Sequence, residues 1–396
     1  MPEMNDPNET VKVPMDEAKD SRGHSDAGTK ERKPRLVVFL GAGGVGKTTL
    51  SASYAAYLAE KGYKVGLISI DPAKRLQSAF GGSGITEEGS IIHEAGDGHL
   101  RGCMLDLSSS LRRWIRAEGL EGDHEERLFA HPLFRTVTEK IASATETLAP
   151  VRMAEWLEQY PETDYLIIDT APGIHAVDFV IRPERLLAFL DSKILEWLQW
   201  FAGSGDDANW FQKMVRGGAR GILQALGKVG GENLILSLGE MLLLLDKMFF
   251  RMVGRLQQAR IWLSDPATEI YTVAALRDDA ISVSRELSRL MSEQSIQPDA
   301  LLLNRALSYA MLTQKNSLEA VEPGSSEERL LQQFVLSMIE KQQQIQRSIA
   351  NTREFKNVYT LPVMSNLENK TELRIQDLKD LGEALYDQLD TRQAAG

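Results

Sequence analysis

The amino-acid sequence predicts an α/β fold in which a mostly parallel central sheet is flanked by helices. Short apolar runs rich in leucine and β-branched residues alternate with stretches of helical periodicity. The runs lack the polar alternation of half-exposed strands, so we expect helices to cover both faces of the sheet. A glycine-rich turn joins the first run to the first helix. The expected strands are 36–40, 65–70, 101–107, 165–169, 270–275, 301–304 and 358–361.

The chain divides into a tail and a domain. Residues 1–33 are polar, mixed in charge and free of aromatic side chains, which is typical of a disordered tail. Residues 34–396 form the predicted α/β domain, which ends in an amphipathic helix over about 371–389. Two stretches, at about 108–160 and 190–264, are helical throughout and lie between strands. We expect them to be insertions that pack together as a helical subdomain beside the sheet.

Composition limits the classes of function. The 396 residues are 43% hydrophobic and 26% charged, as in globular proteins with a sizeable core. A net charge of −11 argues against sequence-blind nucleic-acid binding, which needs a basic surface. The single cysteine, Cys103, excludes an intrachain disulfide and a cysteine-cluster metal site, and we expect it to be an apolar strand residue. No secretory signal or membrane-spanning segment is evident, so we expect a cytoplasmic protein.

The turn after the first strand carries the clearest chemistry. It reads G-x-x-x-x-G-K-T between a buried strand and a helix, the context of a phosphate-binding loop (P-loop) and of the P-loop NTPase fold. Lys47 is expected to reach the β- and γ-phosphates of a triphosphate, and the Thr48 hydroxyl to be a ligand of Mg²⁺. The cofactor-binding residues predicted here are Gly41, Ala42, Gly43, Gly44, Val45, Gly46, Lys47, Thr48 and Thr49.

Two aspartates end apolar strands, at the edge where a parallel sheet presents its ligands. Asp169 follows Leu-Ile-Ile and is suited to hold Mg²⁺ through a water molecule. Asp71 ends the strand that follows the P-loop helix, and Pro72 forces the chain to turn there. We expect the Asp71 carboxylate to orient or deprotonate the attacking water, so that its loss impairs hydrolysis far more than binding.

These segments together resemble one family. Gly43–Thr49, Asp71-Pro72-Ala73 and Asp169-Thr170-Ala171-Pro172 are similar to the P-loop, switch I and switch II of the arsenite-pump ATPase (ArsA) family. That family includes the eukaryotic tail-anchored-protein targeting ATPase and belongs with MinD and ParA among dimeric ATPases. The resemblance implies ATP and Mg²⁺ as cofactors and a homodimer. It also implies that Asn304 reads adenine and that Pro362 packs against it; by itself, Asn304 would be a turn residue and Pro362 a strand terminator.

The chain departs from the family in the side chains that join two subunits or bind metalloid. Ala42 stands where relatives have a signature lysine that reaches the partner's nucleotide, so dimer-coupled hydrolysis requires another residue, such as Lys74 or Arg75. Because Cys103 is alone, neither metalloid-binding cysteines nor a zinc-bridging C-x-x-C can exist.

The family resemblance leaves three functions open. The first is an ATPase switch whose helical subdomain grips an apolar helical client or a membrane-protein partner. The second is an ATPase subunit that energises an anion pump, and the third is a MinD- or ParA-like spatial organiser. Residues 234–255 carry a broad apolar surface with methionines, which suits either a client groove or the interior of a helical subdomain.

Overall fold

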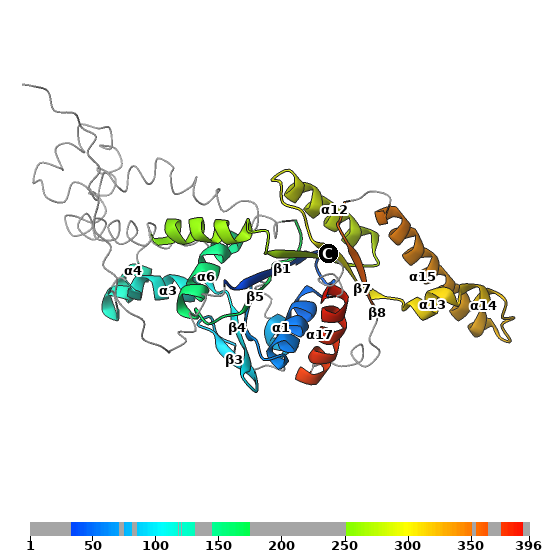
Figure 1. Ribbon diagram of the computed structural model, residues 1–396, viewed down its shortest axis with the longest axis horizontal. Helices are drawn as coiled ribbons and strands as arrows, with labels where there is room; N and C mark the ends of the chain where they lie inside the picture. Colours follow the sequence, from blue (N-terminus) through cyan, green and yellow to red (C-terminus); the bar gives the residue numbers. More distant parts are fainter. Residues whose placement is uncertain are drawn as a thin grey trace, which may run out of the picture. The chain divides into compact units, whose positions relative to one another are not determined.

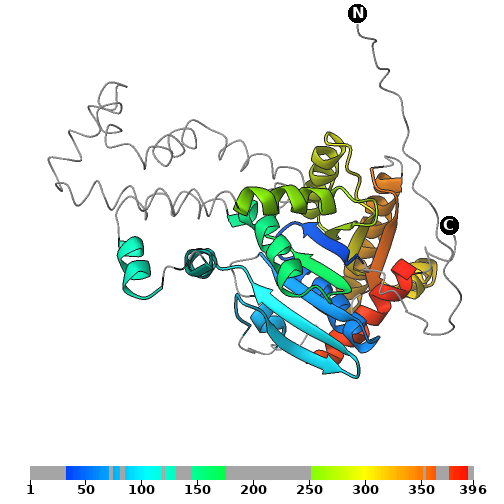
Figure 2. The same ribbon diagram turned by 60° about the vertical axis from the view of Figure 1, so that its left-hand side comes forward.

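The computed structural model describes residues 33–70, 75–80, 85–117, 119, 121–130, 145–174, 251–350, 354–362 and 374–390. Within them, one mixed sheet carries helices on both of its faces (Figures 1 and 2). This arrangement confirms the predicted α/β class. The helical insertions predicted at 108–160 and 190–264 lie only partly within the described residues, and residues 175–250 lie outside them.

Eight strands of the described chain form the sheet in the order β3-β4-β2-β5-β1-β6-β7-β8. All neighbouring pairs are parallel except β3 and β4, which are antiparallel. Strand β5 lies between β1 and β2, although it follows both in the sequence. The strands are β1 (Arg35–Gly41), β2 (Lys64–Ser69), β3 (Ser90–Ala95), β4 (Gly98–Met104), β5 (Tyr165–Asp169), β6 (Glu269–Ala275), β7 (Ala300–Ala306) and β8 (Val358–Pro362).

All seven expected strands are present, but two details at the β3–β4 edge differ from expectation. Strand β3 was not expected, because it is a half-exposed edge strand and its sequence lacks a continuous apolar run. Strand β4 ends at Met104 rather than at residue 107, where helix α3 (Leu107–Ala117) has already begun. The Asp106 carboxylate accepts hydrogen bonds from the backbone N–H and the hydroxyl of Ser109, at 2.9 and 2.6 Å. This N-terminal capping starts a helix where apolar leucines favoured a strand.

The side chains of the central strands alternate between two hydrophobic cores. On one face, Val37 and Phe39 pack with helices α1 (Lys47–Glu60) and α17 (Ile375–Asp390), which lie side by side in both views. On the other face, Leu36, Val38 and Leu40 pack with α6 (Thr145–Gln159), with helical residues 251–263 and with the end of α12 (Asp278–Ser292). The strands are therefore buried on both faces, as their uninterrupted apolar sequences indicate.

Within the described ranges, the remaining helices lie in the connections between strands. They are α2 (Arg75–Ala79), α4 (Asp123–Ala130), α13 (Tyr309–Thr313), α14 (Lys315–Glu319) and α15 (Ser326–Ala350). The C-terminal half of α15 buries Ile339, Ile345 and Ile349, whereas its N-terminal half exposes apolar side chains. No helix within the described ranges has both the length and the apolar content needed to span a membrane.

Candidate functional site

The glycine-rich turn lies between β1 and α1, at the carboxyl edge of the parallel strands. Gly41 and Gly46 have φ angles of +148° and +94°, which strongly favour glycine, and a Cβ on Gly41 would lie 2.2 Å from the Val273 carbonyl oxygen. Helix α1 begins at Lys47, so the N–H groups of its first turn and its helix dipole are directed at the loop. The backbone thus forms an anion-binding cradle of the kind that accepts phosphates.

Lys47 is directed into this loop. Its ammonium donates hydrogen bonds to the carbonyl oxygens of Gly41 (3.1 Å) and Ala42 (2.9 Å), and the residue is only 5% exposed. A buried ammonium is tolerated because these carbonyl dipoles compensate its lost hydration. The same position suits contact with a polyphosphate, whose oxygens would replace the carbonyls as acceptors.

A cluster of three oxygen-bearing side chains lies beneath the loop. The Asp169 carboxylate at the end of β5 is fully buried and accepts hydrogen bonds from the Thr48 hydroxyl (2.8 Å) and the Ser69 hydroxyl (3.0 Å). Strand register accounts for the cluster, because Asp169 is paired with Phe39 of β1 on one side and with Ser69 of β2 on the other. Three segments therefore meet at one carboxylate: the predicted P-loop, the predicted switch II and the end of β2.

These donors fit Mg²⁺, which prefers oxygen ligands and is commonly held by one or two carboxylates together with substrate phosphates. Thr48 and Asp169 are the two residues predicted to hold it, and the structure brings them into direct contact. Within the described ranges, no group of three or more His, Cys, Asp or Glu side chains is arranged to bind a metal. The arrangement offers a carboxylate and hydroxyl oxygens, to which a bound nucleotide would add phosphate oxygens.

Residues after Asp169 are hydrogen-bonded to backbone carbonyls of β1 and of the P-loop. The Thr170 hydroxyl donates to the Phe39 carbonyl at 2.7 Å, and the Gly173 N–H donates to the Gly41 carbonyl at 3.0 Å. The predicted switch II therefore starts in contact with the loop that it is expected to sense. Asp71 and Lys74 lie outside the described residues, and nothing is described of the Arg75 side chain.

Asn304 and Pro362 lie at the ends of β7 and β8, on the same edge of the sheet. The Asn304 side-chain amide donates to the Val45 carbonyl at 2.9 Å, and its oxygen accepts from the Arg305 N–H at 2.9 Å. Asn304 therefore braces the P-loop. This structural role was not predicted from the sequence, which suggested only that Asn304 reads adenine. Pro362 is half-buried and pairs with Ala306 in the register of the two strands.

Ser69 is the one member of the oxygen cluster that the sequence analysis missed. It is fully buried and polar in an otherwise apolar strand, two residues before Asp71. A buried serine at the carboxyl end of a strand beside a P-loop was the available signal. By itself, however, such a serine is compatible with an ordinary strand end.

Cys103 is buried in β4 and takes no part in the site. Burial raises the pKa of its thiol to about 11, so it remains protonated at neutral pH. Because the thiolate is the reactive and metal-binding form, Cys103 behaves as an apolar strand residue, as expected from its sequence context.

Comparison with known proteins identifies a family match and several relatives. The chain matches a family described as anion-transporting ATPases over residues 34–342. It is 35% identical over 162 residues to ATPase GET3 of Paracoccidioides lutzii, an alignment that covers 39% of this chain and 46% of that protein. It is 34% identical over 159 residues to the ATPase ASNA1 homolog of Babesia bovis, an alignment that covers 39% of this chain and 40% of that protein.

A third relative is the arsenical pump-driving ATPase of Escherichia coli, which is 31% identical over 165 residues, covering 40% of this chain and 27% of the relative. The chain thus spans about half or less of the length of these three curated relatives. The family match is broader, because it extends over most of the described sheet and includes the P-loop, Asp169 and Asn304. On that match, the chain belongs to the anion-transporting ATPase family.

Proposed function

We propose that the chain is a Mg²⁺-dependent ATPase that binds ATP at residues 41–49 and hydrolyses it to ADP and phosphate. The observation that carries this proposal is the contact of Thr48 and Ser69 with the buried Asp169 carboxylate beneath a P-loop. Family membership supports ATP as the nucleotide, since the family and the relatives named above are described as ATPases.

Each residue has a distinct role in the proposed reaction. Lys47 and the first-turn amides of α1 bind the phosphates, while Thr48 would hold Mg²⁺ directly and Asp169 would hold it through a water molecule. When bound, the ion would supply positive charge to the phosphate oxygens. Asp71 is proposed to orient the water that attacks the γ-phosphorus. Asn304 is proposed to read adenine while bracing the P-loop, and Pro362 to pack against the base.

The wider function proposed is that of a cytoplasmic, homodimeric switch. Loss of the γ-phosphate would alter the segments that follow Asp71 and Asp169, and a helical subdomain would move and release an apolar helical client or a membrane-protein partner. The N-terminal half of α15 supports a partner surface, because Leu330, Leu331 and Phe334 are 61–67% exposed on it. Light scattering with ADP and with a non-hydrolysable ATP analogue tests nucleotide-dependent dimerisation directly.

A second candidate function is an ATPase subunit that energises an anion pump. The family's description and the pump-driving relative favour it. Stimulation of the ATPase rate by oxyanions would support the pump. Stimulation by lipid vesicles or by DNA would instead support a spatial organiser of the MinD or ParA kind, and stimulation by an apolar transmembrane peptide would support client binding.

Calorimetry and a phosphate-release assay on the full chain test the central proposal. We expect wild type to bind ATP in magnesium buffer, Lys47→Ala to lose productive binding, and Asp71→Asn to bind ATP but hardly turn it over. Lys61→Ala is a matched control, because Lys61 lies exposed just beyond the other end of α1. If wild type shows no heat of ATP binding, the proposed function is wrong. If only Asp71→Asn hydrolyses normally, its role alone is misassigned.

A further inference from the structure

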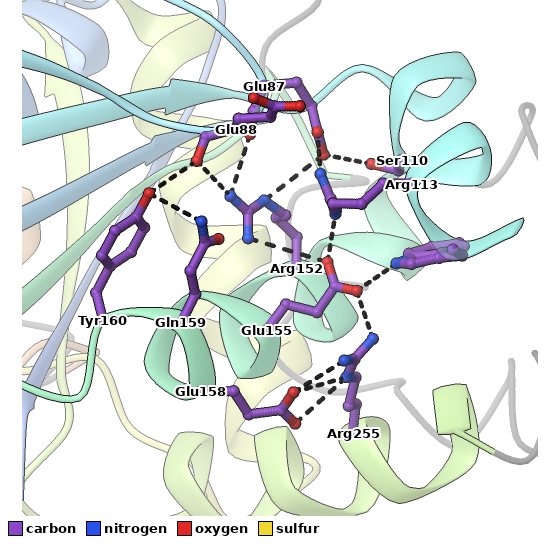
Figure 3. Close-up of polar contacts among 11 residues, drawn as sticks. Glu87, Glu88, Ser110, Arg113, Arg152, Glu155, Glu158, Gln159, Tyr160 and Arg255 are labelled. Atoms are coloured by element: carbon purple, nitrogen blue, oxygen red, sulfur yellow. Dashed lines mark hydrogen bonds and ion pairs between the residues drawn. The ribbon is translucent and has the colours of Figure 1, made fainter. Parts of the chain in front are cut away.

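Away from the P-loop, ion pairs join four segments of the protein (Figure 3). Glu87 lies between α2 and β3, Arg113 on α3, Arg152 and Glu155 on α6, and Arg255 on helical residues 251–263. We refer to these five residues as the charge chain. The Arg113 guanidinium forms ion pairs with the carboxylates of Glu87 and Glu155, and its distance to Glu155 is 2.6 Å. Arg255 also pairs with Glu155. One continuous set of ion pairs therefore links the β2–β3 connection to residues 251–263.

The members at the centre of the charge chain are buried. The side chains of Glu87 and Glu155 are 6% and 7% exposed, and Arg152 is not exposed at all. Buried charges persist when they are paired, and removing one partner leaves the other without compensation. If one of these segments moves, the segments paired with it must therefore move too, or its charged side chains must exchange ion-pair partners.

Arg152 is placed for such an exchange. Its Nη2 donates to the carbonyl oxygens of Glu87 (3.1 Å) and Glu88 (3.4 Å), which fixes one side of the guanidinium. Its Nε lies 3.6 Å from Glu87 Oε1, and its Nη1 lies 3.9 Å from Glu155 Oε2. Neither of these two nitrogens forms a hydrogen bond within the described part of the chain. The guanidinium therefore lies between two carboxylates and is hydrogen-bonded to neither.

Both carboxylates are connected to the nucleotide site through the backbone. Glu87 lies in the connection from β2 to β3, and the Ser69 hydroxyl at the end of β2 donates to Asp169. Glu155 lies on α6, the helix that leads into β5, and Asp169 is the last residue of β5. A rearrangement around Asp169 that shifts the end of β2 relative to β5 would therefore change the separation of Glu87 from Glu155.

We propose that Arg152 exchanges between Glu87 and Glu155 with the nucleotide state, and that Arg255 passes this exchange to residues 251–263. This inference rests on the proposed function and names the residues through which the nucleotide site and the helical segment are coupled. Coupling between two sites is reciprocal, so a variant that biases Arg152 must also alter the relative affinity for the two nucleotides.

Two isosteric variants provide the test. Glu87→Gln removes one carboxylate, so that Arg152 can pair only with Glu155. Glu155→Gln removes the other, so that Arg152 can pair only with Glu87. We expect the ratio of the affinities for Mg·ADP and a non-hydrolysable Mg·ATP analogue, measured by calorimetry, to change in opposite directions. A change of about fivefold or more each way is the usual size of such coupling. If these carboxylates have a purely structural role, the affinity ratio does not change, or it changes in the same direction in both variants. Glu88→Gln is the matched control, since Glu88 neighbours Glu87 in the sequence but is exposed.

Hydrogen–deuterium exchange provides a second readout and does not depend on turnover. In wild type, we expect residues 251–263 to exchange at different rates with the two nucleotides, and Arg255→Met to abolish that difference while basal ATPase activity stays within about twofold. Arg255 is partly exposed, so this variant remains informative if a buried glutamine variant fails to fold. Wild type that binds neither nucleotide overturns the proposed function. Wild type that binds both nucleotides but shows affinity changes of one sign, or an unaltered exchange difference in Arg255→Met, overturns this inference alone.

Discussion

Replacing Gly46 with alanine perturbs the contact between the P-loop and Asn304. Gly46 has φ +94° and ψ 20°, a left-handed conformation that costs an alanine about 1–2 kcal/mol. The new Cβ would also lie 2.3 Å from the Asn304 side-chain nitrogen, which donates to the Val45 carbonyl. Displacing that amide forfeits a hydrogen bond worth about 1 kcal/mol. We therefore expect Gly46→Ala to lower the free energy of unfolding by about 2–3 kcal/mol.

A double-mutant cycle isolates the contact from the backbone strain. In Gly46→Ala/Asn304→Ala, the clash is gone and the hydrogen bond is lost only once, so the double variant should cost about 1 kcal/mol less than the sum of the singles. Gly62→Ala is the control, because Gly62 has φ +90° at the other end of α1 but open space around its Cβ position. Its cost should add to that of Asn304→Ala. Urea denaturation followed by tryptophan fluorescence measures all five variants, and full additivity at Gly46 would refute the bracing role of Asn304.

Three further predictions concern the metal site, the charge chain and the cysteine. Asp169→Asn should lower kcat for ATP hydrolysis by about 100-fold and raise the Mg²⁺ concentration needed for half-maximal rate, as steady-state assays would show. Arg152→Met should reduce the free energy of unfolding by about 3 kcal/mol, because it leaves buried carboxylates with fewer cationic partners; calorimetric melting measures this. Burial raises the pKa of Cys103 from 9.0 to about 11, so its contribution to stability is complete below pH 9 and is lost as pH rises through 11. Relative to Cys103→Ala, wild type should lose about 2 kcal/mol of unfolding free energy between these pH values.

The central strands and the P-loop were predictable because their determinants are local. Val37–Leu40 is an uninterrupted apolar run, and the glycines, Lys47 and Thr48 follow it at fixed spacing. Strand β3 was not predictable, because an edge strand with alternating exposure carries little apolar content. The charge chain was equally hidden, since nothing near Arg152 in the sequence shows that Glu87, 65 residues earlier, accepts its hydrogen bond through a backbone carbonyl.

The oxygen cluster at Asp169 shows most clearly what local patterns leave out. Thr48 and Ser69 donate to this carboxylate across sequence separations of 121 and 100 residues, and they do so because β5 is inserted between β1 and β2. Long connections join these strands, and the entropy cost of closing a connection grows only slowly with its length. The spacing of strands in the sequence therefore carries little information about the order β2-β5-β1. Sequence patterns predicted that Asp169 and Asp71 end their strands at the same edge of the sheet. The insertion of β5 between β1 and β2 determines that the P-loop threonine and the serine that ends β2 donate to one carboxylate, that of Asp169.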